Sequence, residues 1–97
     1  MQDIKSMKQN QKNIFIKKLL YRSKHRGCKE LDLILGKFAD WFLPNNDEEN
    51  LRNFAMLLQQ EDIDIYNWIT HKTLPPIHLN SKVMESLLKF DINKNNE

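Results

Sequence analysis

The sequence predicts an all-α protein, folded as a compact five-helix bundle. Apolar residues recur at intervals of three and four along most of the chain, and no alternating strand pattern persists. Only two glycines and three prolines interrupt the 97 residues, so the connections between helices should be short. A chain of this length forms one domain, expected to comprise residues 1–97 with an ordered core of about 13–92 and disordered termini.

The first two helices are predicted on either side of Gly27. Residues 1–11 are polar and are expected to fray, and the first helix should run from Asn13 to near Arg22–Lys24. The second helix should begin near Cys28. The apolar positions of these two helices are, in chain order, Ile14, Phe15, Ile16, Leu19 and Leu20, and then Leu31, Ile34, Leu35, Phe38 and Phe42.

The remaining three helices are predicted from capping residues as well as from apolar spacing. Asn45 or Asn46 is expected to cap a third helix, and Asp62 a short fourth helix. The double proline of "HKTLPP" marks a loop, after which Asn80 or Ser81 should start the fifth helix. The apolar positions of these helices are, in chain order, Leu51, Phe54, Ala55 and Leu58, then Ile65, Trp68 and Ile69, then Val83, Met84, Leu87 and Leu88.

The net charge of +2 conceals a strong polarity. Residues 1–29 hold nine Lys or Arg and one Asp, whereas residues 30–97 hold six Lys or Arg and twelve acids. A basic segment on an acidic body steers acidic partners, and nucleic acid is the first such partner to consider. The single cysteine fits a reducing compartment, and no stretch is apolar enough to span a bilayer. We therefore expect a cytoplasmic protein without a membrane partner.

The residue types argue against several kinds of chemistry. Two glycines cannot build a loop such as G-x-G-x-x-G, so no cofactor is expected to bind to the chain by itself. One cysteine and three histidines lack zinc-ligand spacing, so no metal site is expected. His25 and Cys28 could form a thiolate pair, but no further residue is placed to fix them. An enzyme acting through this pair is therefore the weakest hypothesis.

Gly36 and the two tryptophans are first interpreted as structural residues. Gly36 lies within the second helix, where glycine costs about 1 kcal/mol relative to alanine, so close helix–helix packing is expected there, with close approach of a partner's backbone as the alternative. Trp41 and Trp68 stand at helical spacing and are expected in the core, with one of them partly exposed at an interface.

The segment "RSKHRGCKELD" carries the pattern Arg26-Gly27-x-x-Glu30 where the basic segment ends and the second helix begins. In the structural interpretation, Gly27 adopts a positive φ in the loop and Glu30 stabilises the start of the helix. That interpretation gives no role to Arg26. It also leaves the dense charge at this corner of the chain unexplained.

The sequence resembles the succinate dehydrogenase assembly factor family, whose signature is R-G-x-x-E. "LLYRSKHRGCKELDLILGKFAD" is similar to the first half of that family, especially its alphaproteobacterial branch. "LLQQEDIDIYNWI" is similar to the family's L-L-x-x-x-D-x-D-L-x-x-W-[IL] segment. The two segments cover roughly residues 15–70, in the order and spacing of the family.

The resemblance implies a small five-helix assembly factor of the bacterial cytoplasm, without enzymatic activity of its own. Such a protein binds the flavoprotein subunit of succinate dehydrogenase, and in some bacteria that of fumarate reductase. It promotes the covalent bond between a histidine of that subunit and the 8α-methyl group of FAD, which the partner holds.

Carried over to this chain, the family signature implies a set of partner-binding residues. Arg26 and Glu30 would be its polar contacts, and Gly27 would allow close approach. Arg22, His25 and Lys29 would flank them. Asp32 is expected to be structural, since it lies one residue past the helix face that holds Cys28 and Glu30. A small nucleic-acid-binding protein with a basic face remains the alternative.

Overall fold

The computed structural model describes residues 7–91, and between them the chain forms five α-helices and two short 3₁₀ turns. In chain order the elements are α1 (Gln9–Lys24), α2 (Lys29–Phe42), η1 (Leu43–Asn45), α3 (Glu48–Leu58), α4 (Asp62–Ile69), η2 (Ile77–Leu79) and α5 (Lys82–Lys89). The predicted all-α class and five-helix bundle are therefore confirmed. Of the termini expected to be disordered, residues 1–6 and 93–97 lie outside the described part of the chain.

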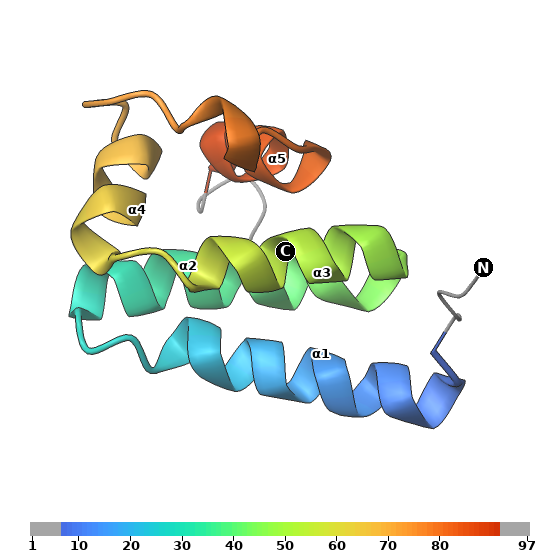
Figure 1. Ribbon diagram of the computed structural model, residues 1–97. Helices are drawn as coiled ribbons and strands as arrows, with labels where there is room; N and C mark the ends of the chain where they lie inside the picture. Colours follow the sequence, from blue (N-terminus) through green and yellow to red (C-terminus); the bar gives the residue numbers. More distant parts are fainter. Residues whose placement is uncertain (1–6, 92–97) are drawn as a thin grey trace.

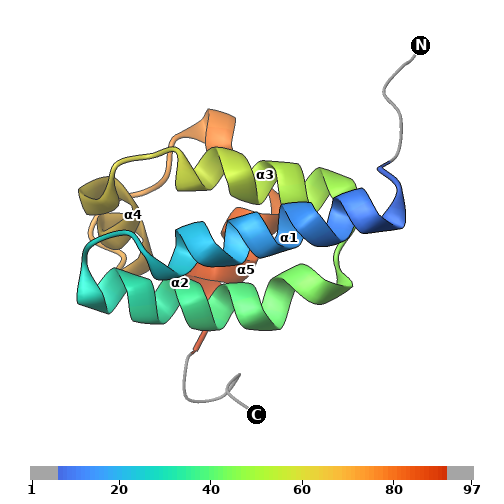
Figure 2. The ribbon, with the colours of Figure 1, turned by 90° about the horizontal axis from the view of Figure 1, so that it is seen from below.

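The helices are stacked in three layers. α2 and α3 form the middle layer, and α1 packs against both of them from one side (Figures 1 and 2). α4 and α5 cover the opposite side, where α5 contacts both α3 and α4 (Figure 1). One long face of α1 is thus left without a neighbouring helix in the described structure.

The core lies between the three layers and takes residues from all five helices. Its fully buried members include Leu19 of α1, Leu35 of α2, Phe54 of α3 and Ile65 of α4. Phe38 is the aromatic centre, with ring centroids 5.0 Å from Phe42, 5.8 Å from Phe54 and 5.4 Å from Phe90. Except for Ile14 and Ile34, the apolar positions predicted from helical spacing therefore meet in one continuous core or pack against it.

The two tryptophans differ, as the sequence predicts. Trp68 is buried with the core, whereas Trp41 remains 46% exposed beside Phe38 and Phe90. Gly36 is also buried, and a Cβ atom there would lie 3.0 Å from Cγ of Lys24. The close packing expected at Gly36 is confirmed. The neighbour that requires it is the aliphatic stem of a lysine from α1.

The start of α1 differs from the prediction. The helix begins at Gln9, although residues 1–11 were expected to fray. Its first turn is stabilised by polar side chains: the backbone N–H of Lys8 donates to Gln11 Oε1 at 3.1 Å, and the Gln9 amide donates to Asn13 Oδ1 at 3.0 Å. Polar residues thus supply the hydrogen bonds that an apolar pattern does not reveal.

Two predicted helix caps are also wrong. Asp47 caps α3 by accepting the N–H of Asn50, because Asn45 is taken up in η1 and the Asn46 amide donates to the carbonyl of Phe42. α4 starts after Glu61, and the carboxylate of Asp62 is occupied elsewhere. The Ser81 hydroxyl caps α5 by accepting the N–H of Met84, which confirms one of the two predicted caps of this helix.

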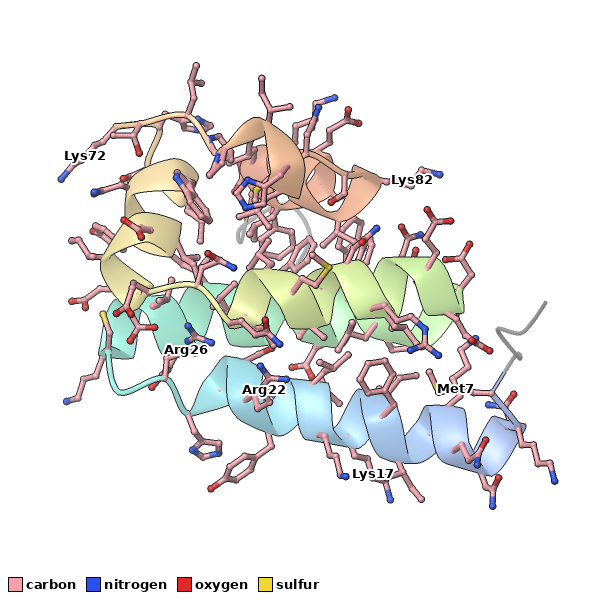
Figure 3. The ribbon with its side chains drawn as sticks, viewed as in Figure 1. Met7, Lys17, Arg22, Arg26, Lys72 and Lys82 are labelled. Carbon is pink, nitrogen blue, oxygen red and sulfur yellow. The ribbon has the colours of Figure 1, made fainter. Side chains whose placement is uncertain are left out.

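Met7 lies just before the start of α1 (Figure 3), and its backbone N–H donates to the carboxylate of Glu48 at the start of α3. Among residues 7–91, no helix combines the length and the apolar character that crossing a bilayer requires.

Candidate functional site

The corner between α1 and α2 is made by residues 25–28, and its shape depends on Gly27. Gly27 has φ +98°, a conformation that residues with a Cβ atom rarely adopt. A Cβ built at this position would meet nothing within 4 Å, so the space beside it is open. The positive φ predicted for a loop glycine is confirmed, and the open space leaves room for another molecule to approach the backbone.

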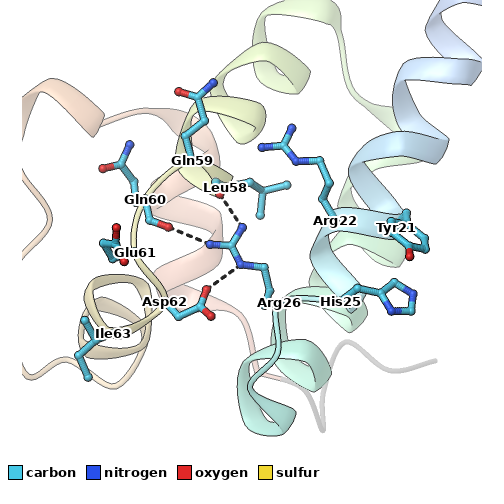
Figure 4. Close-up of a pocket in the computed structure, with 10 residues that line it drawn as sticks. All are labelled: Tyr21, Arg22, His25, Arg26, Leu58, Gln59, Gln60, Glu61, Asp62 and Ile63. Atoms are coloured by element: carbon cyan, nitrogen blue, oxygen red, sulfur yellow. Dashed lines mark hydrogen bonds and ion pairs between the residues drawn. The ribbon is translucent and has the colours of Figure 1, made fainter.

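The side chain of Arg26 points into the protein. Its guanidinium donates to the backbone carbonyls of Leu58 and Gln60 and to Asp62 Oδ1, the last two at 2.8 Å (Figure 4). The side chain is only 11% exposed. Arg26 therefore binds the connection between α3 and α4 to the corner between α1 and α2, and its charge faces the carbonyl end of α3.

The backbone of Arg26 is fixed as well. Its N–H donates to Asp32 Oδ1 at 2.6 Å, across the first turn of α2. The structural role expected for Asp32 is thereby confirmed. Asp32 and Arg26 together hold the corner from both sides, so that the loop around Gly27 is a defined part of the surface.

The other predicted site residues project outward from this corner. Arg22, His25, Lys29 and Glu30 are all exposed. The His25 ring stacks on Tyr21 with a centroid separation of 4.1 Å, and the Cys28 thiol donates to Glu30 Oε1 at 3.5 Å. Arg22 and Lys29 form no ion pair with any residue between 7 and 91. The corner thus presents three basic side chains and one carboxylate to a partner.

An open hollow of about 480 Å³ lies beside the corner, between the end of α1 and the α3–α4 connection. Arg22 and the stacked pair of Tyr21 and His25 lie on one side of it, while the guanidinium of Arg26 forms part of the opposite wall (Figure 4). The remaining lining residues are Leu58, Gln59, Gln60, Glu61, Asp62 and Ile63. The hollow carries charges of both signs, which suits a polar protein surface better than a polyanion.

Two residues that contribute to this site, Tyr21 and Asp62, were not predicted from the sequence. Tyr21 stands four residues before His25, the spacing at which helix side chains meet, and that spacing was the available signal. Asp62 gave no such signal for Arg26, because the two residues are 36 positions apart. Among the described residues, no group of three His, Cys, Asp or Glu side chains could hold a metal ion.

Most of the chain matches a known protein family. Residues 17–91 match the family model described as "flavinator of succinate dehydrogenase". The chain belongs to this family. The matched range includes the whole α1–α2 corner and the α3–α4 connection to which Arg26 binds.

Several proteins named "Succinate dehydrogenase assembly factor 2, mitochondrial" are similar to the chain. The protein of Dictyostelium discoideum is 46% identical over 69 residues, which are 71% of this chain and 49% of that protein. The Arabidopsis thaliana protein is 34% identical over 93 residues, covering 96% of this chain and 50% of that protein. The Saccharomyces cerevisiae protein is 42% identical over 84 residues, covering 82% of this chain and 52% of that protein.

The chain therefore spans about half the length of these relatives. All three are named as mitochondrial, so they do not support the bacterial cytoplasm expected from the sequence. The family also gives no support to the nucleic-acid alternative.

Proposed function

We propose that the chain is an assembly factor that binds the flavoprotein subunit of succinate dehydrogenase and promotes covalent attachment of FAD to it. The match of residues 17–91 to the flavinator family carries this proposal. FAD would stay in the partner, and the chain itself would bind no cofactor and catalyse no reaction of its own. The flavoprotein of fumarate reductase and a cytoplasmic location remain predictions of the same kind.

The geometry of the corner supports a specific division of roles among its residues. Arg26 would act from within, because its guanidinium already binds Leu58, Gln60 and Asp62. Glu30, Lys29, His25 and Arg22 would touch the partner, since all four are exposed. Gly27 would let the partner approach the backbone closely, because no atom beyond Gly27 and its two chain neighbours lies within 4 Å of the position a Cβ would take.

Such a helper can accelerate a covalent step on its partner in two ways. By binding mobile parts of the flavoprotein, it can hold the histidine and the flavin in reacting geometry. Its charged side chains can also stabilise charge that develops near the flavin ring, and they act more strongly once water is excluded from the interface. Both ways need a rigid corner, which Arg26 and Asp32 provide.

Co-expression with the flavoprotein subunit tests the proposal, using flavin fluorescence on a denaturing gel to measure covalent FAD. We expect covalent flavin with the parent chain and little without it. Equal flavin in both cultures, or none in either, would contradict the proposed function.

Glu30→Gln tests the corner itself. A hydrogen bond to a charged group contributes about 1.5–3 kcal/mol, so its loss at the interface should lower flavinylation roughly tenfold to a hundredfold. Glu49→Gln is the matched control, because Glu49 is exposed and is the second residue of α3, as Glu30 is of α2. It should flavinylate like the parent. Equal rates for the two variants would remove Glu30 from the site.

A further inference from the structure

The face of α1 that lacks a neighbouring helix has an unusual mixture of side chains. It carries what we call the outer α1 stripe, consisting of Ile14, Lys17, Lys18, Tyr21 and Arg22. These side chains line a shallow depression of about 380 Å³. Leu19 and Ser23 of the same helix are fully buried on its opposite face. The stripe is therefore separate from the core and faces outward, as Lys17 does in Figure 3.

The stripe exposes a large apolar area for a surface helix. Ile14 is 53% exposed and Tyr21 65% exposed. The two residues are seven positions apart, which is two helical turns, so they lie on the same side of α1. Covering two such side chains with another apolar surface is favourable in water.

The cations of the stripe lack partners within the described chain. Lys17, Lys18 and Arg22 form no ion pair with any residue between 7 and 91. By contrast, Lys24 at the end of the same helix pairs with Asp40 at 3.0 Å. These three cations, unpaired among residues 7–91, line the same depression as the two exposed apolar side chains, and carboxylates of another molecule would complement them.

The stripe continues into the hollow beside the α1–α2 corner, because Tyr21 and Arg22 line both. Glu61 and Asp62 stand on the far side of that hollow. Asp62 is paired with Arg26, but the exposed Glu61 carboxylate forms no ion pair with any residue between 7 and 91 and repels a polyanion that follows the stripe to its end, such as nucleic acid or a lipid surface. A protein segment can place acidic residues beside the stripe and other residues beside the hollow, so it fits the whole surface.

We propose that the outer α1 stripe docks an acidic, amphipathic segment of a protein partner. Carboxylates of that segment pair with Lys17, Lys18 and Arg22, and its apolar side chains cover Ile14 and Tyr21. The inference rests on the proposed function in one respect, namely that the partner is the flavoprotein subunit. It extends the contact surface about two helical turns beyond the R-G-x-x-E corner.

Titration of the purified chain with the flavoprotein subunit, at low and at physiological salt, tests this docking. Lys17→Glu/Lys18→Glu should raise Kd about thirtyfold and weaken its salt dependence, because paired charges become opposed. Ile14→Ser should raise Kd about fivefold through lost apolar contact. Both variants should keep the melting temperature of the parent, since the three side chains lie outside the core.

Matched controls separate the stripe from general charge and hydrophobicity. Lys72→Glu/Lys82→Glu changes the net charge equally, and both lysines lie at the α4–α5 end of the protein, away from α1 (Figure 3). Ile77→Ser removes an isoleucine that is 90% exposed in η2. Each control should change Kd by less than about threefold. Equal losses in controls and stripe variants, or no loss in either, would overturn the proposal.

A second probe keeps this inference distinct from the proposed function. If the parent chain does not bind the flavoprotein subunit, the proposed function fails. The stripe is then judged with a synthetic helical peptide that carries a leucine stripe flanked by glutamates. Binding of the peptide to the parent, but not to Lys17→Glu/Lys18→Glu, would support the docking surface. Weaker binding of this peptide than of duplex DNA or phosphatidylglycerol vesicles would refute it.

Discussion

Replacing Arg26 by methionine should destabilise the protein strongly, although the residue belongs to a motif on the surface. Methionine keeps much of the aliphatic stem but removes the guanidinium that donates to Leu58, Gln60 and Asp62. The Arg26 side chain is 11% exposed and the Asp62 side chain 38% exposed, so the ion pair is partly screened by water. Most of the loss should come from the two carbonyls left without their donor.

The expected loss in the free energy of unfolding is about 2–4 kcal/mol. Each carbonyl left without its donor costs about 1–3 kcal/mol, and water entering from the open hollow can replace some of the lost hydrogen bonds. For a domain of 97 residues this corresponds to a fall in the melting temperature of roughly 10–25 °C. Urea denaturation followed by circular dichroism at the helix band measures the change, as a lower midpoint with an unaltered slope.

Arg22→Met is the matched control, because the same replacement occurs one turn earlier on an exposed side chain. It should change the free energy of unfolding by less than about 0.5 kcal/mol while weakening partner binding. Equal stability of the two variants would refute the positioning role of Arg26. Arg26 would then have to act by touching the partner.

Three further substitutions test local features by the same denaturation assay. Gly27→Ala should lower the free energy of unfolding by about 1–2 kcal/mol through backbone strain alone, because φ is +98° and a Cβ would meet no atom beyond the chain neighbours within 4 Å. An unchanged denaturation midpoint would show that the loop relaxes freely. Gly36→Ala should be neutral or stabilising by up to about 1 kcal/mol, since the flexible stem of Lys24 can move away by a few tenths of an ångström. A large decrease in the free energy of unfolding would mean that the Lys24 side chain cannot move. Ser81→Ala should lower the free energy of unfolding by about 1 kcal/mol, because it removes the hydroxyl that accepts the Met84 N–H. A loss near zero would mean that packing alone fixes the start of α5.

The helices were predictable because their signals are local. Apolar spacing located α2 and α5 closely, and Ser81 was one of two predicted caps for α5. The start of α1 was missed because its first turn is stabilised by amide side chains such as Gln9 and Gln11, which carry no apolar pattern.

The failures at the site have a different physical origin. Asp62 was predicted to cap α4, yet its carboxylate accepts from Arg26 instead. The partner contact predicted for Arg26 stays a prediction, but the contacts of its guanidinium with the α3–α4 connection were not predicted. The wrong cap and the missed contacts have one cause, because Arg26 and Asp62 are 36 positions apart and a single sequence contains no signal for such a pair. Contact of the exposed residues with a partner stays a prediction.

The inward contact of Arg26 also determines when the corner can acquire its shape during folding. The residues that hold its guanidinium lie 32 to 36 positions further along the chain. During synthesis the motif therefore emerges first but stays unanchored until the α3–α4 connection has followed it. A peptide covering only residues 22–32 would contain the entire R-G-x-x-E signature without the contact that orients it. The residues of the motif are close together in the sequence. The surface that they form nevertheless depends on contacts with residues 32 to 36 positions away, so it is completed late in folding.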